Sequence, residues 1–288
     1  MSNNFNIAVV GATGNVGREI LQILEQRKFP IDKIYLLASS RSKGKKIEFK
    51  KKEIVVEDLA EFDFSKVHIG FFSPGGLVSA EYAPKAAKKG CIVIDNTSHF
   101  RMNDDVPLVV PEVNAEVLED FFQQDGRSNI IANPNCSTIQ MVVALKPLHD
   151  LAGLKRVVVS TYQSVSGAGR AGMDELFNQT KGIFVNDSVT PVAFTKQIAF
   201  NVIPHIDTFL DDGSTREEWK MVSETRKILD SSIDLTVTCV RVPVFIGHSE
   251  SVNLSFAKPI DMEQAQTILR SAPGVIVVDK HEDGGYIT

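Results

Sequence analysis

Three glycines spaced three residues apart near the N-terminus restrict the fold of this chain more than any other feature. Gly11, Gly14 and Gly17 follow the apolar run Asn6–Val10 and open the amphipathic stretch Val16–Arg27. Because glycine has no Cβ, such a G-x-x-G-x-x-G turn can pass tightly from strand to helix and bring backbone N–H groups close to a pyrophosphate. The helix N-terminus also favours that negative charge. The pattern predicts a dinucleotide site on a Rossmann-like βαβ unit.

Short apolar runs alternate with helical stretches through the first half of the chain. This alternation is typical of βαβ units and predicts a parallel sheet with helices on both faces. The expected elements are the strands Asn6–Val10, Lys33–Ala38, His68–Ser73, Cys91–Asp95 and Ile130–Asn133, and the helices Val16–Arg27 and Ala80–Lys89. The rhythm changes after Asn133, so we expect residues 1–133 to form a nucleotide-binding domain and residues 134–288 a second domain.

The second half of the chain predicts a mostly β domain that also contains helices. The expected elements are a helix from Ser137 through Leu148, the strand Arg156–Tyr162, a Gly-rich loop Ser164–Gly172, an amphipathic helix Glu217–Leu229, a β pair of Leu235–Val244 and Ser249–Ala257, and a strand Gly274–Lys280. The resulting fold class is α/β, with a Rossmann-like parallel sheet domain followed by an α+β domain.

Composition excludes several classes of protein. With 43% hydrophobic residues in 288, the chain can bury a sizeable core and is not expected to be disordered. Its formal charge of −5 gives no general attraction for nucleic acid, and the basic run from Arg41 to Lys52 holds only Phe49 as an aromatic residue. The three cysteines form no C-x-x-C pair, so we expect no metal and a reducing cytoplasm. No apolar stretch approaches the ~18 residues of a membrane-spanning helix.

The end of the second expected strand bears on which dinucleotide is bound. Sites that prefer NAD usually carry an acidic residue there, which binds the adenosine ribose. This chain has Ser39, Ser40, Arg41 and Ser42 instead. A guanidinium with neighbouring hydroxyls suits a 2′-phosphate, so the sequence favours NADP. The alternative is that Arg41 belongs to a solvated basic loop.

Cys136 stands near the start of the helix expected after Ile130–Asn133, in the segment NPNCST. At a helix N-terminus, the dipole and the free N–H groups lower a thiol pKa and can stabilise an oxyanion on an attacked carbonyl. Cys91 and Cys239 lie inside apolar runs and are predicted to be inert core residues. The position of Cys136 indicates a nucleophile, although local sequence leaves a buried structural cysteine open as the alternative.

Several separate motifs occur in the order found in one enzyme family. They are GATGNVG, SHFRM with Arg101, NPNCST with Cys136, STYQSVSGAG with Gln163, REEWKM with Lys220, and RVPVFIGHSESV with Arg241 and His248. Together they cover essentially the whole chain, which resembles the aspartate-semialdehyde dehydrogenases. The resemblance implies NADPH-dependent reduction of L-4-aspartyl phosphate to L-aspartate 4-semialdehyde and phosphate, in the biosynthesis of lysine, methionine and threonine. It also implies that the second domain binds substrate and forms a homodimer or homotetramer.

A thioester mechanism accounts for the residue types that the motifs supply. An acyl phosphate acylates well but accepts hydride poorly, so a thiolate that first forms a thioester divides the reaction into two easier steps. By resemblance Cys136 is that nucleophile and Gln163 orients the acyl group; a polar residue at a strand exit is the alternative for Gln163. Collapse of the thiohemiacetal needs proton movement, which an imidazole can supply near neutral pH. His248 is the candidate, and the other five of the six histidines are expected to be structural or surface groups.

Cationic side chains match the two anionic groups of aspartyl phosphate. By resemblance Arg101 and Lys220 bind the phosphate, and Arg241 pairs with the α-carboxylate. Glu217 is expected to receive the substrate's ammonium, and the alternative is a solvated i,i+3 ion pair with Lys220 on a helix surface. The residues expected to bind the cofactor are Gly11, Thr13, Gly14, Asn15, Val16, Gly17, Arg41, Ser42, Ser166 and Gly167.

The chain ends at GGYIT, whereas members of this family usually continue for several tens of residues. We therefore expect a C-terminally incomplete second domain, low activity, and association through an unpaired sheet edge. Two other functions compete with the main one. One is an inactive NADP-binding remnant, and the other is an N-acetylglutamyl-phosphate reductase, which NPNCST in place of its NPGCYPT type and the presence of Glu217 both disfavour.

Overall fold

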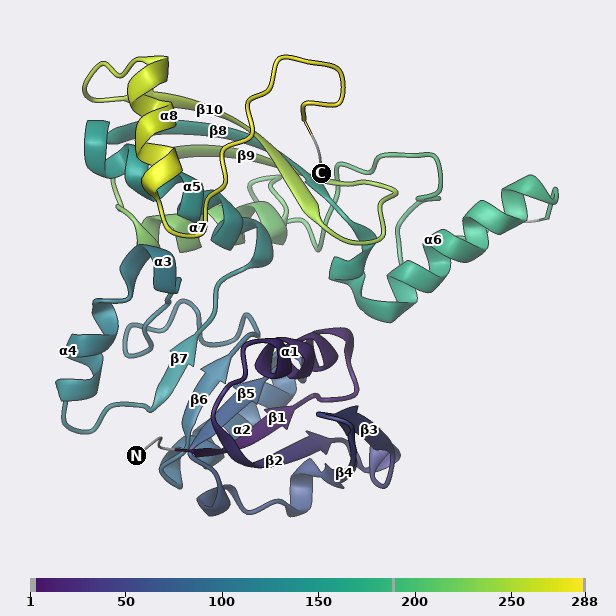
Figure 1. The fold of residues 1–288 in the computed structure, drawn as a ribbon. Helices are drawn as coiled ribbons and strands as arrows, with labels where there is room; N and C mark the ends of the chain where they lie inside the picture. The colour runs from purple at the N-terminus through teal and green to yellow at the C-terminus, as the bar shows by residue number, and fades with distance from the viewer. Residues whose placement is uncertain (1–3, 188–189, 287–288) are drawn as a thin grey trace. The chain divides into compact units, whose positions relative to one another are not determined.

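The computed structural model describes residues 4–187 and 190–286. The chain divides into two compact units, each of which is described by itself (Figure 1). The first unit comprises the chain up to Val109 together with Glu116–Pro134 and Ser166–Asn178. The second comprises Val110–Ala115, Asn135–Val165 and the chain from Gln179 onward.

A seven-stranded sheet forms the centre of the first unit, with the strand order β3-β4-β2-β1-β5-β6-β7. The strands are β1 (Phe5–Val10), β2 (Ile31–Ala38), β3 (Lys46–Phe49), β4 (Lys52–Asp58), β5 (Ile69–Phe72), β6 (Ile92–Asp95) and β7 (Ile130–Ala132). Neighbouring strands run parallel except for the antiparallel hairpin of β3 and β4. The loops after β1, β2 and β5 therefore leave the sheet at one edge, where open α/β sheets bind their ligands.

Apolar residues at helical spacing hold α1 (Asn15–Gln26) on this sheet. Leu21 and Leu24 are buried with Ile7 and Val9 of β1 in one cluster. Full burial of each such side chain contributes about 1.5–3 kcal/mol, so this cluster fixes the turn between β1 and α1. Further helices and short 3-10 turns in the described residues are η1 (Ser40–Ser42), η2 (Leu59–Glu61), η3 (Phe64–Lys66), α2 (Gly76–Lys88), α3 (Pro111–Asn114), α4 (Val117–Gln123), η4 (Val165–Ala168) and α6 (Gly169–Phe184).

Three strands form the sheet of the second unit, in the order β10-β8-β9. The central strand β8 (Leu154–Gln163) runs parallel to β9 (Asp234–Arg241) and antiparallel to β10 (His248–Phe256). Helices α5 (Cys136–Ala152) and α7 (Arg216–Ile228) pack against this sheet, and α8 (Met262–Ser271) packs against α5 (Figure 1). Residues of both helices and all three strands share one apolar cluster, which includes Met141, Leu145, Val157, Val159 and Met221.

The strand register of this second sheet gathers polar residues at one end. Gln163, the last residue of β8, lies opposite His248 of β10 on one side and Arg241 of β9 on the other. Each of these side chains comes from a different strand. The sheet therefore brings together three residues that are far apart in the sequence.

The predicted fold class is confirmed, since a mainly parallel sheet is followed by an α+β unit. Several predicted elements need correction. Residues 46–58, for which no element was expected, form the β3–β4 hairpin. The expected pairing of Leu235–Val244 with Ser249–Ala257 is wrong, because β8 lies between β9 and β10 and buries alternate side chains against the helices.

Two further segments differ from the expectation. The Gly-rich segment Ser164–Gly172 is not an open loop, because η4 ends at Ala168 and α6 begins at Gly169, whose φ is 72°. The segment Gly274–Lys280 is not a strand, since it enters no ladder with another part of the described chain, and apolar alternation alone cannot supply a pairing partner. Within residues 4–187 and 190–286, no helix is long and apolar enough to span a membrane.

Candidate active site

Cys136 is the first residue of α5, and Asn135 caps this helix. The side-chain Oδ1 of Asn135 accepts hydrogen bonds from the backbone N–H groups of Ser137 (2.9 Å) and Thr138 (3.4 Å). Its own backbone N–H donates to the buried carboxylate of Glu224 at 2.6 Å. The turn before the sulfur is thus fixed from two directions, and the sulfur lies at the positive end of the helix dipole.

His248, the first residue of β10, contacts the sulfur of Cys136. Its Nε2 lies 3.3 Å from Sγ of Cys136, and Cys136 is exposed. The other ring nitrogen, Nδ1, accepts a hydrogen bond from the backbone N–H of Ser164 at 3.0 Å. A backbone N–H can only donate, so the neutral ring carries its proton on Nε2 and directs it at the sulfur.

The surroundings of His248 keep the ring neutral. Burial lowers its pKa below the ordinary value, and the positive charge of Arg241 acts in the same direction, although a backbone contact with Gly247 opposes them. A neutral imidazole with its N–H facing a sulfur can stabilise a thiolate and exchange a proton with a reacting oxygen.

Glu217 connects the nucleophile turn to the sheet. Its Oε1 accepts hydrogen bonds from Nδ2 of Asn135 (2.8 Å) and from Nε2 of Gln163 (3.2 Å). Gln163 also donates to the hydroxyl of Ser137. An ionised carboxylate can only accept, so the amide of Gln163 must turn its NH₂ toward Glu217. The buried Oε1 of Gln163 has no hydrogen-bond partner among the described residues.

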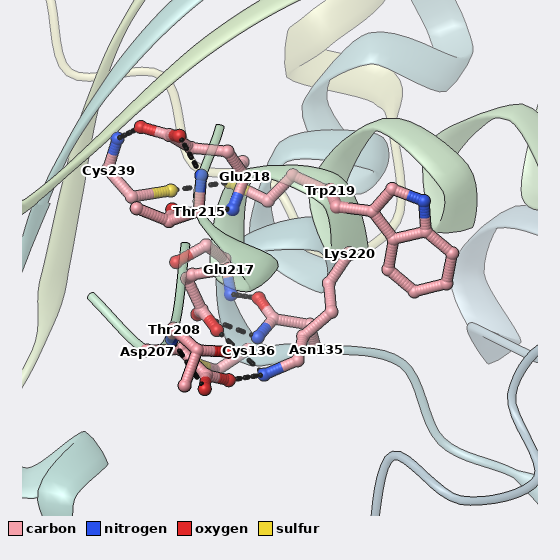
Figure 2. Close-up of polar contacts among 12 residues, drawn as sticks. Asn135, Cys136, Asp207, Thr208, Thr215, Glu217, Glu218, Trp219, Lys220 and Cys239 are labelled. Carbon is pink, nitrogen blue, oxygen red and sulfur yellow. Dashed lines mark hydrogen bonds and ion pairs between the residues drawn. The ribbon is translucent and has the colours of Figure 1, made fainter. Parts of the chain in front are cut away.

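Lys220 lies between two carboxylates (Figure 2). Its Nζ is 3.1 Å from Oε2 of Glu217 and 2.8 Å from Oδ2 of Asp207. Burial alone would raise the pKa of Glu217, but the charge of Lys220 and three hydrogen bonds hold it below the ordinary value. Burial likewise opposes the ionised form of Lys220, yet Glu217 and Asp207 together raise its pKa. All three groups are therefore charged near neutral pH.

Arg241 completes this cluster at the end of β9. Its Nη1 donates to the backbone carbonyl of Ser164 at 2.6 Å, and the residue is buried. Burial lowers its pKa, while the negative charge of Glu217 opposes that shift. The second unit thus brings together five of the predicted residues, namely Cys136, Gln163, Glu217, Arg241 and His248, with Lys220 bound to Glu217.

Arg101 belongs to the first unit, in the loop after β6. Its Nε donates to the carbonyl of Asn133 at 2.9 Å and its Nη2 to the carbonyl of Asn96 at 3.0 Å. The residue is buried, and both contacts fix the guanidinium against the ends of β6 and β7. A guanidinium held by two backbone carbonyls has a defined orientation.

A pocket of about 550 Å³ lies at the edge of the first sheet where β1, β2 and β4 end. This volume is within the range of small-molecule sites. Gly11 has a φ of 84°, and a Cβ there would lie 2.7 Å from the carbonyl oxygen of Ser73. A Cβ on Gly17 would overlap the carbonyl of Gly11. The tight backbone turn that the glycines predicted is therefore present, since a Cβ at Gly11 or Gly17 would meet neighbouring backbone.

The predicted cofactor residues divide into two groups. Gly11, Thr13, Gly14 and Arg41 line the pocket, together with Ser39, Ser40 and Asp58. Asn15, Val16, Gly17 and Ser42 are their sequence neighbours but are not among its lining residues, and Ser166 and Gly167 lie in η4. Asp58 was not expected there; its Oδ1 accepts a hydrogen bond from the backbone N–H of Ala60.

The two remaining cysteines are buried, as predicted. Burial raises the pKa of Cys91 to about 12 and that of Cys239 to about 12. Cys91 precedes β6 rather than lying inside it, and Cys239 lies within β9. Thiols that resist ionisation in this way are poor nucleophiles, unlike the exposed Cys136.

Several residues of the cluster were missed by sequence reasoning. Asn135 could have been recognised as a helix cap, because it stands directly before a helix start. Asp207 and Glu224 reach the cluster from a loop and from the buried face of α7, and no local motif marks either one.

The sequence matches two family descriptions over most of its length. Residues 6–121 match "Semialdehyde dehydrogenase, NAD binding domain", and residues 145–286 match "Semialdehyde dehydrogenase, dimerisation domain". This chain is a semialdehyde dehydrogenase. The pocket at the Gly-rich turn lies within the residues that match the NAD-binding domain. His248 lies within the residues that match the dimerisation domain, and Cys136 lies between the two matched segments.

Curated relatives of this semialdehyde dehydrogenase share about half of its residues. Aspartate-semialdehyde dehydrogenase 2 of Vibrio cholerae is 54% identical over 276 residues, which are 96% of this chain and 81% of the relative. Aspartate-semialdehyde dehydrogenase of Aquifex aeolicus is 54% identical over 286 residues, covering 98% of this chain and 83% of the relative.

Solved structures of the same family resemble this one closely. The crystal structure of aspartate semialdehyde dehydrogenase II from Vibrio cholerae complexed with ASA has a TM-score of 0.92 at 54% identity, and the match covers 95% of this chain and 80% of that one. Aspartate semialdehyde dehydrogenase with NADP from Candida albicans has a TM-score of 0.69 at 27% identity, covering 93% and 76%. The predicted family and class of enzyme, an oxidoreductase, are confirmed.

Proposed function

We propose that this semialdehyde dehydrogenase reduces L-4-aspartyl phosphate with NADPH to L-aspartate 4-semialdehyde and phosphate. The contact between Sγ of Cys136 and Nε2 of His248, at 3.3 Å, carries the proposal. It is supported by curated relatives that are 54% identical to the chain over the aligned residues and are named aspartate-semialdehyde dehydrogenases. The reaction belongs to the biosynthesis of lysine, methionine and threonine.

Cys136 is the nucleophile of this mechanism. Its thiolate attacks the C4 carbonyl carbon of aspartyl phosphate, the S–C bond forms, and the C–O bond to phosphate breaks. The N-terminus of α5 and the Nε2–H of His248 both stabilise negative charge on the sulfur. The cap made by Asn135 keeps the first turn of α5 in place during the attack.

His248 moves the proton that the second half-reaction needs. When bound at the Gly-rich turn, NADPH supplies the hydride that reduces the thioester. Nε2–H of His248 then donates its proton to the oxygen of the thiohemiacetal and takes it back as the aldehyde forms and the thiolate leaves. The hydrogen bond from Ser164 to Nδ1 keeps the ring in the tautomer required for this transfer. Gln163 orients the acyl group from the neighbouring strand.

The charged side chains bind the remaining groups of the substrate. Arg241 pairs with the α-carboxylate and Glu217 with the ammonium, while Lys220 and Arg101 bind the phosphate. The burial of Arg241 and Glu217 supports these pairings, because charge-assisted hydrogen bonds are stronger away from water.

The Gly-rich turn and the residues that follow β2 bind NADP in this proposal. The turn at Gly11, Thr13 and Gly14 lies against the pyrophosphate, and Arg41 contacts the 2′-phosphate. The N–H groups of Gly11 and Gly14 hold the turn in shape, since they donate to the carbonyls of Leu37 and Gly11. The proposal is supported by the volume of the pocket that these residues line, which is in the range of small-molecule sites, and by a family member from Candida albicans that was solved with NADP. The other proposed cofactor residues are Asn15, Val16, Gly17, Ser42, Ser166 and Gly167.

The dimerisation domain of the family supports a homodimer or homotetramer. We also propose a cytoplasmic location, because a thiolate nucleophile must stay reduced to act. The proposed division for function is a cofactor domain of residues 1–133 and a substrate and dimerisation domain of residues 134–288.

A spectrophotometric assay in the reverse direction tests this function. The purified chain is mixed with L-aspartate 4-semialdehyde, NADP and inorganic phosphate, and the formation of NADPH is followed. We expect NADPH to form only when phosphate is present, because phosphate must release the acyl group from Cys136. Phosphate-dependent turnover of N-acetylglutamate semialdehyde alone, or turnover of neither aldehyde, would contradict the proposal.

A further inference from the structure

The ion pair between Lys220 and Glu217 creates a conflict with substrate binding. Oε2 of Glu217 accepts a hydrogen bond from Nζ of Lys220 at 3.1 Å, while Oε1 accepts from the amides of Asn135 and Gln163. The carboxylate that should receive the substrate's ammonium thus already holds an ammonium group of the protein. A second ammonium group at Oε2 would lie close to Nζ of Lys220, and the repulsion between the two positive charges favours movement of Lys220 away from Glu217.

A partly buried lysine needs a second partner in order to move. The side chain of Lys220 is 16% exposed, so a Lys220 without a counter-charge would carry a desolvation cost. Asp207 supplies that counter-charge, since its Oδ2 lies 2.8 Å from Nζ of Lys220 (Figure 2). Its side chain is 32% exposed, and its pKa is held below the ordinary value by the hydrogen bond from Lys220, against the effect of burial.

The backbone around Asp207 aims its carboxylate at Lys220. Asp207 has a φ of 69°, a left-handed conformation that costs energy for most residues, and its Oδ1 accepts a hydrogen bond from the backbone N–H of Thr208. The carbonyl of Thr208 accepts from the N–H of Arg216 at 2.8 Å, and Phe209 pairs with Thr215. The loop is therefore fixed to the first turn of α7, the helix that carries Glu217 and Lys220.

We propose that Asp207 is a positioning residue that retains Lys220 when the substrate's ammonium takes the place of Lys220 on Glu217. This inference rests on the proposed function. The buried Oε1 of Gln163, which has no partner among the described residues, is an acceptor in the same cluster and favours an added N–H donor there. The substrate's ammonium replaces Nζ of Lys220 on the carboxylate of Glu217. Asp207 then keeps Lys220 paired and near the phosphate that Lys220 binds.

Replacement of Asp207 by asparagine removes the negative charge of the side chain but keeps the backbone conformation of the loop. Asparagine tolerates a positive φ as well as aspartate does, and its Oδ1 can still accept from Thr208. Asp207→Asn therefore removes the anionic partner of Lys220 with little change to the loop. Asp211→Asn is the matched control, because Asp211 is an exposed aspartate of the same loop.

The test compares two aldehydes, L-aspartate 4-semialdehyde and its analogue without the amino group, succinate semialdehyde, as substrates or as competing inhibitors. We expect Asp207→Asn to raise the KM for aspartate semialdehyde about tenfold, which is the loss of roughly one charge-assisted hydrogen bond. The constant for succinate semialdehyde should change less than about twofold, because that molecule does not displace Lys220. Asp211→Asn should change neither constant.

Each outcome separates the inference from the function on which it rests. An equal effect of Asp207→Asn on both aldehydes, or no effect on either, would overturn the role of Asp207 while the wild-type chain still turns over aspartate semialdehyde with phosphate. A wild-type chain that shows no such turnover would instead overturn the proposed function. Thermal unfolding of Asp207→Asn is measured in parallel, and a KM effect confined to the amino-bearing aldehyde is one that general destabilisation does not produce.

Discussion

Nε2 of His248 lies 3.3 Å from Sγ of Cys136, while Nδ1 of the same ring accepts the backbone N–H of Ser164. The hydrogen bond from Ser164 determines whether Nε2 presents a proton or a lone pair to the sulfur. With Nδ1 occupied as an acceptor, the neutral ring presents a proton to the sulfur instead of a lone pair. His248 is therefore arranged to stabilise a thiolate and to lend a proton to oxygen.

Replacement of His248 by glutamine should lower kcat about 100-fold or more, because a glutamine amide can donate toward Sγ but cannot release its proton. Burial lowers the pKa of His248 below its ordinary value of 6.5, so the wild-type enzyme should lose activity only when the pH falls below that value and the ring becomes charged. A pH–rate profile checks both points. The acid limb should vanish in His248→Gln and persist in the control His281→Gln; an unchanged limb in His248→Gln would exclude this role.

Replacement of Arg241 by leucine should lower kcat/KM for aspartate semialdehyde about 10–100-fold, the range for a lost charge-assisted contact. Arg241 also donates to the carbonyl of Ser164, whose N–H orients His248, so part of the loss should appear in kcat. Cofactor affinity, measured by NADPH fluorescence titration, should stay unchanged. A parallel fall in NADPH affinity would show that Arg241 has a structural role instead.

Replacement of Arg41 by alanine should narrow the preference for NADP over NAD by about 1–3 kcal/mol, because the guanidinium is the proposed partner of the 2′-phosphate. Arg41 lines the pocket at the Gly-rich turn, whereas Arg18 on α1 lies beside a different pocket and serves as the control. Dissociation constants for both dinucleotides check the prediction. Equal affinities of the unmodified chain for NAD and NADP would refute it.

Glu250 should make the stability of the protein depend on pH. Its carboxylate accepts a hydrogen bond from Gln140 at 2.8 Å, and burial raises its pKa from 4.5 to about 7. The folded state therefore holds a proton that the unfolded state releases between these values, so this contribution to the free energy of unfolding is full below about pH 4.5 and is lost as the pH rises to about 7.

Glu250→Gln removes that dependence and keeps an acceptor for Gln140. At about pH 8 the variant should be more stable than the wild type by about 1–2 kcal/mol, and at about pH 5 the difference should be small. Chemical denaturation at both pH values measures this difference. A constant difference between the two proteins would show that Glu250 does not titrate in this range.

The sequence predicted the parts of the site that carry a local pattern. The Gly-rich turn, the helix start near Cys136 and the strand end near Gln163 all stand at element boundaries, which periodicity and turn chemistry indicate. The end of β9 at Arg241 was not predicted, because the expected strand ran to Val244. Which strands are neighbours was not predictable in this way. β8 pairs with β9 along one edge and with β10 along the other, and no local pattern in the sequence indicates these partners. This strand order places Gln163 beside both His248 and Arg241.

Asp207 and Glu224 could not be predicted from the sequence for the same physical reason. Asp207 reaches Lys220 through a left-handed backbone conformation, and Glu224 reaches Asn135 across 89 positions of sequence. Neither contact produces a periodic pattern in the sequence. The β3–β4 hairpin did leave a periodic pattern, since Ile47 and Phe49 are buried between exposed neighbours, although no strand was predicted there.

A covalent adduct on Cys136 is the most direct measure of the proposed chemistry. The chain is incubated with L-aspartate 4-semialdehyde and NADP without phosphate, digested at acidic pH, and the peptide that contains Cys136 is weighed by mass spectrometry. Oxidation of the thiohemiacetal should leave an aspartyl group joined to Sγ as a thioester, which disappears when phosphate is added and is absent from Cys136→Ala. Phosphate-dependent turnover that continues in Cys136→Ala, or that proceeds with no adduct on Cys136, would contradict the account.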